Sequence, residues 1–258
     1  MKRFVRSAWA LAIAGAFVAP TMAAAQANKP VVAVLSFDNN SIGKDHADYD
    51  GVGKGLQDFL TNDLVTNNTF TVVDRDRIQQ VLKEQDLAKQ GSIDPQTAVR
   101  IGKILGAQYM ITGGFMSDGR GKVVATARAI NVETTQITNP QKVTGSADDV
   151  LGLIAQLSTK VSSDMKLPAM KHDMGMGNMD MGGMHETKPA AAKPAETKSA
   201  PQVKMDLRTA MLYSKALDAQ DAGDSTKATE LFSQVLAKFP DYTPARQHLA
   251  KVSGSSGD

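Results

Sequence analysis

The stretch from Thr69 to Phe115 constrains the fold more than any other part of the chain, because it predicts a strand, two helices and a second strand in succession. Phe70 to Val73 is a short aromatic and β-branched run typical of a strand, and Tyr109 to Thr112 is another. Between them, apolar residues recur three or four positions apart, which is the spacing of a helix with one buried face. This order of elements predicts an α/β domain.

The two predicted helices have recognisable ends. Asp74 lies where an N-cap residue belongs, and we expect the helix after it to continue until Gly91. Asp94 and Pro95 begin the second helix, because proline already has the φ of a first-turn residue, and Gly106 ends it. The apolar residues expected on the buried faces are Ile78, Val81, Leu82, Ala98, Ile101, Ile104 and Leu105.

The segments on either side complete a mixed sheet covered by helices. Upstream, the sequence predicts a central strand, a polar loop and an amphipathic helix, over Val31 to Phe37, Asp38 to Tyr49 and Val52 to Asn67. Downstream, strand-like runs separated by turns predict hairpins, over Tyr109 to Met116, Lys122 to Val132 and Ile137 to Thr144. A last helix is expected over Ala147 to Met165.

The order VVDRDRIQQVLKEQDLAKQG, then TAVRIGKILGAQYMITG, resembles the core of the curli-assembly CsgG family. With VAVLSFDNN before it and ARAINVETTQI after it, the resemblance extends from about Val31 to Met165. It implies a CsgG-like α/β domain over residues 28–166. For function it implies a curli secretion subunit, a lipoprotein activator of penicillin-binding proteins, or another envelope accessory protein.

The curli secretion channel that this domain resembles builds a membrane barrel from two additional long β-hairpins per subunit. Transmembrane strands of this kind need about 9 to 11 residues each, with an apolar outward face. The sequence has no unassigned insertion of that kind between Val31 and Met165. We therefore do not expect the chain to form a pore by itself.

Residues 1–27 have the three parts of a secretory signal peptide: a basic start, the apolar run Ala8 to Ala19, and a small-residue ending at Ala27. The run is shorter than the about 20 residues that span a bilayer, so we expect cleavage and no integral membrane span afterwards. We therefore expect export to the periplasm, where the protein could also associate peripherally with the outer membrane. Many relatives are lipoproteins with a cysteine at this site, whereas the chain has no cysteine.

Composition excludes several classes of function. Removal of the signal takes away Lys2, Arg3 and Arg6, which leaves 26 of the 29 basic residues against 27 acidic residues in the mature chain. A nearly neutral chain without an arginine-aromatic cluster does not predict nucleic-acid binding. The absence of cysteine excludes disulfides, thiolate nucleophiles and zinc-thiolate sites.

Residues 167–204 change abruptly to a linker composition. Its second half is a Pro/Ala/Lys spacer, and its first half alternates methionine with glycine and histidine. Thioether and imidazole groups suit Cu(I), whereas the alternative is a low-complexity linker whose methionines are tolerated or oxidised sacrificially. The candidate metal ligands are Met170, His172, Met174, Met176, Met179, Met181, Met184 and His185.

Residues 205–253 predict a small all-α module, with a short disordered tail over residues 254–258. Two apolar faces separated by Gly223-Asp224 form a helical hairpin, and Pro240 precedes a third helix from Thr243 to Val252. The second half of the pattern is similar to a tetratricopeptide repeat. Because such repeats are stable only when stacked, we expect this module to dock on its third helix, the first domain, a second copy or a partner.

Three further motifs have two interpretations each. The run Gly51 to Gly55 suggests helix-start flexibility more strongly than a phosphate loop, since it lacks the Gly-Lys-Ser/Thr ending. In Asp74 to Arg77 we expect a cap followed by solvated charges, with a partner surface as the alternative. His46 and His248 are expected to be surface histidines, so no catalytic group is predicted.

Together these patterns predict a non-catalytic accessory protein of the cell envelope, for assembly or secretion, that binds envelope proteins or its own subunits, with no cofactor required. The first alternative is an activator of a cell-wall synthase. The second is a periplasmic Cu(I)-binding protein that uses the Met-rich linker.

Overall fold

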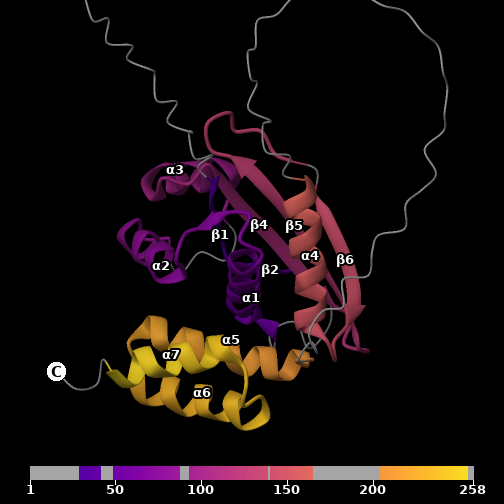
Figure 1. Cartoon of the computed structure of the whole chain (residues 1–258), viewed down its shortest axis with the longest axis vertical. Helices are drawn as coiled ribbons and strands as arrows, with labels where there is room; N and C mark the ends of the chain where they lie inside the picture. The colour runs from indigo at the N-terminus through magenta and orange to yellow at the C-terminus, as the bar shows by residue number, and fades with distance from the viewer. Residues whose placement is uncertain (1–28, 42–48, 88–92, 139, 165–203, 255–258) are drawn as a thin grey trace, which may run out of the picture.

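Figure 1 shows the computed structural model of the protein, which describes residues 29–41, 49–87, 93–138, 140–164 and 204–254. The predicted signal peptide, nearly all of the Met-rich and Pro-rich linker, and residues 255–258 lie outside these ranges. Among the described helices, none is long and apolar enough to cross a membrane.

A six-stranded mixed sheet forms the centre of the molecule, with the strand order β3-β1-β4-β5-β6 and β2 paired beside β4. Strand β1 is parallel to both β3 and β4, β2 is parallel to β4, and β4, β5 and β6 are successively antiparallel. The strands are β1 (Val31–Val34), β2 (Asp38–Asn39), β3 (Thr71–Val72), β4 (Tyr109–Ser117), β5 (Lys122–Asn131) and β6 (Gln141–Ser146).

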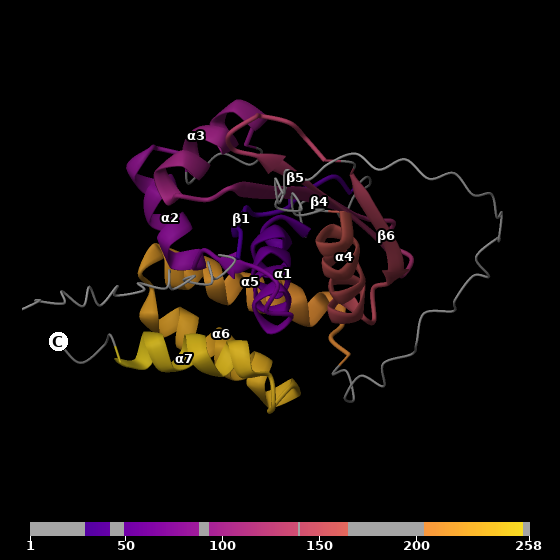
Figure 2. The same ribbon diagram turned by 45° about the horizontal axis from the view of Figure 1, so that its top comes forward.

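Four helices cover the two faces of this sheet (Figures 1 and 2). Helices α2 (Arg75–Glu84) and α3 (Pro95–Leu105) pack on one face against Ala33, Leu35 and Met110. Helices α1 (Val52–Thr66) and α4 (Val150–Asp164) pack on the other face. Because side chains alternate along a strand, β1 contributes to both cores. The predicted α/β class with a mixed sheet is confirmed.

The predicted caps of α2 and α3 are confirmed. The Asp74 carboxylate accepts the backbone N–H of Asp76 at 2.8 Å, and Asp94 accepts that of Gln96 at 2.9 Å. Each carboxylate satisfies an amide that the first helical turn leaves without a partner. Gly106 ends α3 in the left-handed conformation, with φ of 68°.

Helix α2 ends at Glu84, so the expectation that it continues to Gly91 is wrong. Asp86 adopts φ of 55°, and the backbone N–H of Leu87 donates to the Leu82 carbonyl at 2.8 Å. This bond closes the helix in the manner of a Schellman motif, with aspartate in place of the usual glycine.

Two smaller expectations also differ from the structure. The polar segment after Phe37 contains β2, whose Asp38 pairs with Gly114 of β4, where only a loop was expected. Ile104, expected on the buried face of α3, is 46% exposed. A stretch of two residues has too little pattern to reveal a strand, and Ile104 lies at the edge of the apolar stripe.

The C-terminal module contains α5 (Leu207–Ala222), α6 (Ser225–Lys238) and α7 (Thr243–Gly254), so the three predicted helices are present and the third extends two residues beyond the expected Val252. In both views α5 lies nearest to α1, with α6 and α7 on its far side (Figures 1 and 2). Apolar side chains of α1, α4 and α5 share one core. The module therefore docks on the α/β domain, while its similarity to a tetratricopeptide repeat stays a prediction.

Candidate functional site

The junction between α1 and α5 is the most highly organised polar region of the described structure. Here the helices touch at Gly55, whose backbone N–H donates to Ser214 Oγ at 3.0 Å. The same hydroxyl donates to the Val52 carbonyl at 3.2 Å. A Cβ atom at Gly55 would lie 2.3 Å from Ser214 Oγ, and the three atoms nearest to it all belong to α5. Glycine at this position is what allows α5 to dock.

Gly53, in the same run, serves the α/β domain itself. A Cβ atom there would lie 1.9 Å from the Phe37 carbonyl oxygen. Gly51 precedes α1 with φ of 88°, a conformation that glycine adopts without strain. These observations give the Gly51 to Gly55 run a packing role, beyond the flexibility expected from the sequence.

A buried carboxylate lies at the centre of the junction. Asp58 of α1 is 4% exposed, and its Oδ2 accepts the Tyr213 hydroxyl at 2.6 Å and the Asn62 amide at 2.8 Å. Its Oδ1 lies 3.5 Å from His248 Nε2 of α7. His248 Nδ1 is 2.9 Å from Gln220 Oε1, so the other ring nitrogen is also held. The carboxylate thus contacts side chains from α1, α5 and α7.

The surroundings of Asp58 favour its charged form. Burial by itself raises the pKa of this carboxyl, but hydrogen bonds from His248 and Tyr213 and the positive charges nearby outweigh it, so the pKa lies below its usual 3.8. Burial, followed by the charge of Asp58, raises the pKa of Tyr213 well above 10.0. Tyr213 is therefore a neutral donor to an ionised acceptor, which is a strong type of hydrogen bond.

A second cluster lies beside the first and surrounds Asp221 of α5. Arg75 Nη2 is 2.6 Å from Asp221 Oδ2, and Lys54 Nζ is 3.1 Å from the same atom. Lys83 Nζ donates to the Asp221 carbonyl at 2.6 Å. Lys54 also pairs with Asp218 at 2.5 Å. Basic side chains of α1 and α2 thus converge on the acidic end of α5.

Arg75 is the most constrained of these basic groups. Its side chain is only 3% exposed, and its Nε and Nη1 atoms are buried without a hydrogen-bond partner among the described residues. Arg75 was expected among the solvated charges of the Asp74 to Arg77 motif, and this expectation is wrong. The reason is that α5, which is distant in sequence, covers the first turn of α2.

Aromatic rings complete the junction around Tyr213. Its ring stacks on Phe59 of α1 with centroids 5.3 Å apart, and meets Phe232 of α6 edge-on at 5.7 Å. The His248 ring stacks on Phe232 at 5.5 Å. His248 is 8% exposed, so the prediction of a surface histidine is wrong for this residue. His46 lies outside the described residues.

Asp58, Tyr213 and His248 have the functional groups of an acid–base centre, but each is closed to solvent. A general acid or base has to reach the proton of a substrate within hydrogen-bond distance. In the docked arrangement these groups are 4%, 0% and 8% exposed and are used to bind one another. Their arrangement performs recognition between helices.

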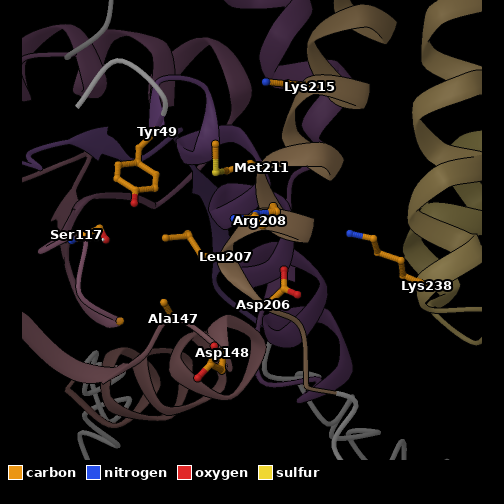
Figure 3. A pocket seen from close by; sticks show the side chains of 12 residues that line it. Tyr49, Ser117, Ala147, Asp148, Asp206, Leu207, Arg208, Met211, Lys215 and Lys238 are labelled. Carbon is orange, nitrogen blue, oxygen red and sulfur yellow. Dashed lines mark hydrogen bonds between the residues drawn. The ribbon is translucent and has the colours of Figure 1, made fainter. Parts of the chain in front are cut away.

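A cleft of about 580 Å³ opens at one end of the junction, between the β4–β5 turn and the start of α5 (Figure 3). Arg208 and Lys215 of α5 and Lys238 of α6 line it, opposite Tyr49 and Ser117. The two acidic groups at the cleft have local partners. Asp206 caps α5, and Asp148 accepts the Ser146 hydroxyl at 3.1 Å. The cleft thus has three basic and two acidic groups, beside the apolar side chains of Ala147, Leu207 and Met211.

The predicted metal ligands lie outside the described residues. This holds for Met170, His172, Met174, Met176, Met179, Met181, Met184 and His185. Within the described ranges, no group of three or more His, Asp or Glu side chains could hold a metal ion. Cu(I) binding by the linker stays a prediction.

Sequence reasoning did not identify Asp58, Arg75, Tyr213, Asp221 and His248 as a group. One signal was present, because Asp58 lies next to the apolar stripe of α1 and Tyr213 lies within that of α5. A polar atom within an apolar stripe requires a partner. Nothing local identifies the partners, which lie as far apart in the chain as Asp58 and His248.

The helix-covered mixed sheet and the three C-terminal helices therefore meet at a junction of buried charges within a shared apolar core. Residues 16–118 match the family model of the curli production assembly/transport component CsgG. This match confirms the CsgG resemblance for the part of the chain that it covers. The resemblance predicted for residues 119–165 lies beyond it. No curated protein sequence matches the chain.

Solved structures include similar domains. The LpoB C-terminal domain from Salmonella enterica is 20% identical, with 46% of this chain and 84% of that chain covered and a TM-score of 0.35. Lipoprotein GNA1162 from Neisseria meningitidis is 13% identical, with coverages of 53% and 98% and a TM-score of 0.38. The PelC dodecamer from Paraburkholderia phytofirmans is 17% identical, with coverages of 52% and 88% and a TM-score of 0.33. At these values the likenesses do not define a function.

Proposed function

We propose that the protein is a non-catalytic accessory protein of the cell envelope, exported through its N-terminal signal, which acts by binding other proteins. The match of residues 16–118 to the CsgG family carries this proposal, because that family is described as a component of curli assembly and transport. The junction is consistent with its non-catalytic part, since the most organised polar groups are buried and join helices of this chain to one another. The roles of synthase activator and Cu(I)-binding protein stay predictions from the sequence.

The described surface offers contacts of the kind that a binding protein uses. Strand β6 ends the described sheet and pairs with β5. Such a strand edge can receive a strand from a partner. Large apolar side chains are also exposed on the α/β domain, at Val65, Ile104, Met116 and Ile137. Single exposed apolar residues are common and do not by themselves indicate a binding site. We use these four positions to attach chemical labels and crosslinkers.

Because the chain contains no cysteine, export can be tested with single introduced thiols. Ile104→Cys, at an exposed position of α3, is expressed with residues 1–27 in a bacterium with two membranes. We expect a maleimide that crosses only the outer membrane to label it in intact cells. The matched control is the same variant without residues 1–27, which should be labelled only after lysis. Labelling of both proteins only after lysis would refute export.

Binding is tested with the same thiols after modification with a photocrosslinker. We expect a discrete adduct with an envelope protein from at least one of Val65→Cys, Ile104→Cys, Met116→Cys and Ile137→Cys. A buried thiol at Leu60→Cys serves as the negative control, because Leu60 is fully buried. Absence of a discrete adduct from all exposed positions, in cells where the protein is exported, would contradict the binding role.

A further inference from the structure

The junction has the properties of an interface between two recognition partners. One partner is the acceptor face, which we define as Lys54, Gly55, Asp58, Arg75 and Lys83 of α1 and α2. The other is the tail, which we define as helices α5–α7. The polar contacts of the acceptor face with the tail are those to Tyr213, Ser214, Asp218, Asp221 and His248.

The junction combines buried charged groups with the apolar core that α1, α4 and α5 share. Arg75 and Asp58 are buried charges, and two nitrogens of Arg75 lack hydrogen-bond partners among the described residues. Burying charged groups is costly even when they are paired, so such a junction contributes less stability than an apolar core of the same size. Interfaces between domains that separate and rejoin have this mixed character.

The tail also has internal contacts that do not depend on the acceptor face. Phe232 stacks on His248, and Gly223 and Asp224 close the turn between α5 and α6. The N-cap carboxylate of Asp224 accepts the backbone N–H of Lys227 at 3.0 Å. The three helices of the tail therefore hold together partly by their own contacts. The Tyr213 ring contributes to both sets, since it contacts Phe232 within the tail and Phe59 of α1.

The connection between the two partners is longer than docking within one chain requires. The start of the tail is held at the start of α4, where the Val150 N–H donates to the Met205 carbonyl at 2.8 Å. Helix α4 has 15 residues, so the chain has to return about 22 Å from its end. About seven extended residues would cover this distance. Residues 165–203 provide 39 positions, enough to reach a neighbouring molecule.

We propose that the acceptor face binds the tail of a second copy of this chain as well as its own. The contacts would be those described above, with Asp218 and Asp221 of one copy on Lys54, Arg75 and Lys83 of the other. No new interface is needed, because exchange of an identical element reproduces the existing one. Charge complementarity and the length of the connection together favour this occupant.

In the natural chain, the tethered tail competes with exchange. A tether of this length holds the tail at an effective concentration of roughly millimolar. Exchange between natural copies is therefore expected to become measurable only at high local concentration. Variants that disable the tail in one copy and the acceptor face in the other remove this competition.

The acceptor face is blocked by Gly55→Leu, whose side chain would occupy the space of Ser214 and Ala210 of α5. The tail is disabled by Asp218→Lys with Asp221→Lys, which places positive charges against Lys54 and Arg75. Each full-length variant keeps one functional half of the junction. We expect each alone to be a monomer by light scattering, and an equimolar mixture to form a species of twice that mass.

Matched controls change charge or size away from the junction. Glu230→Lys changes an exposed position of α6, and Lys103→Asp changes an exposed position of α3. Mixtures that contain a control variant should stay monomeric under the same conditions. Circular dichroism and urea unfolding of each variant establish that its α/β domain is folded before mixing.

The expected dissociation constant of the mixed pair is at least tenfold below that of either variant with itself. Adding Gly55→Leu to the Asp218→Lys, Asp221→Lys chain should abolish pairing, because neither partner then has an acceptor face. Folded variants that do not associate on mixing, or that pair equally well with themselves, would overturn the proposal. The inference rests on the junction alone, so it can fail while export and envelope binding are confirmed.

Discussion

The Tyr213 hydroxyl donates a 2.6 Å hydrogen bond to Asp58, joining α5 to α1 across 155 positions of sequence. Tyr213 is fully buried and Asp58 nearly so. An ionised carboxylate in such surroundings needs several donors, and this one has Tyr213, Asn62 and His248. The stability of the α/β domain is therefore coupled to the docking of the C-terminal helices.

Tyr213→Phe removes one donor and leaves the ring in place. We expect the free energy of unfolding to fall by about 1–3 kcal/mol, because a buried charged acceptor loses a hydrogen bond that water cannot replace. Urea unfolding followed by circular dichroism measures the change. Tyr242→Phe is the matched control, since that hydroxyl has no hydrogen bond described here, and its effect should be under about 1 kcal/mol. Equal losses in both variants would contradict the role of the Asp58 contact.

The pKa of Asp58 predicts how stability depends on acid. Its folded-state pKa is lowered below 3.8, so the folded protein keeps this carboxyl ionised when the unfolded chain takes up a proton. The contribution of Asp58 is thus fully present above about pH 5 and is lost as the pH falls through the folded-state pKa.

Comparison with Asp58→Asn isolates this effect. Asp94 and Asp118 also have lowered pKa values, from hydrogen bonds at the α3 N-cap and in the β4–β5 turn, and they act equally in both proteins. We expect the difference in urea midpoint between the natural chain and Asp58→Asn to shrink from pH 5 to pH 3. A difference that stays constant over this range would show that Asp58 does not take up a proton on unfolding.

The sequence predicted most of the helices and the class of the sheet, because these depend on local signals. Asp74, Asp94 and Gly106 have roles that a helix end imposes on any sequence. The apolar spacing in residues 205–253 likewise revealed three helices, although not the surface on which they dock. Local rules therefore defined the elements and left their assembly open.

The junction could not be predicted, because its partners are far apart in the chain. Arg75 has the local pattern of an exposed helical charge, and only the position of Asp221 makes it a buried one. His248 is similar, since a histidine in a polar helix is ordinarily exposed. The sequence shows glycines at the start of α1, but not why they are needed. The structure gives the reason, because Gly53 lies against the Phe37 backbone and Gly55 lies against α5.

Gly53→Ala tests the close approach of α1 to the segment between β1 and β2. The added methyl group would lie 1.9 Å from the Phe37 carbonyl oxygen, so the backbone has to move. We expect a loss of at least about 2–3 kcal/mol in the free energy of unfolding. Gly254→Ala, where a Cβ meets nothing within 4 Å, should be neutral or slightly stabilising. Thermal unfolding of the two variants distinguishes packing from helix propensity, which alone would stabilise both.

The contribution of the buried ion pair between Arg75 and Asp221 can be separated from that of the exposed pair between Lys251 and Asp76. Arg75 and Asp221 side chains are 3% and 12% exposed, whereas those of Lys251 and Asp76 are 52% and 45% exposed. Solvent screens the second pair, and its loss in Lys251→Met should cost under about 1 kcal/mol.

Asp221→Ala leaves Arg75 buried without its carboxylate, and we expect a loss of about 3–5 kcal/mol in the free energy of unfolding. Arg75→Met with Asp221→Ala should recover part of this loss, because the uncompensated charge is gone and Met fills part of the space. A double-mutant cycle by urea unfolding measures the coupling. If Asp221→Ala and Lys251→Met had equal small effects, Arg75 would not need the Asp221 carboxylate, and this ion pair would not hold α5 in place. The tail would then be held mainly by Tyr213 and the apolar contacts of α5.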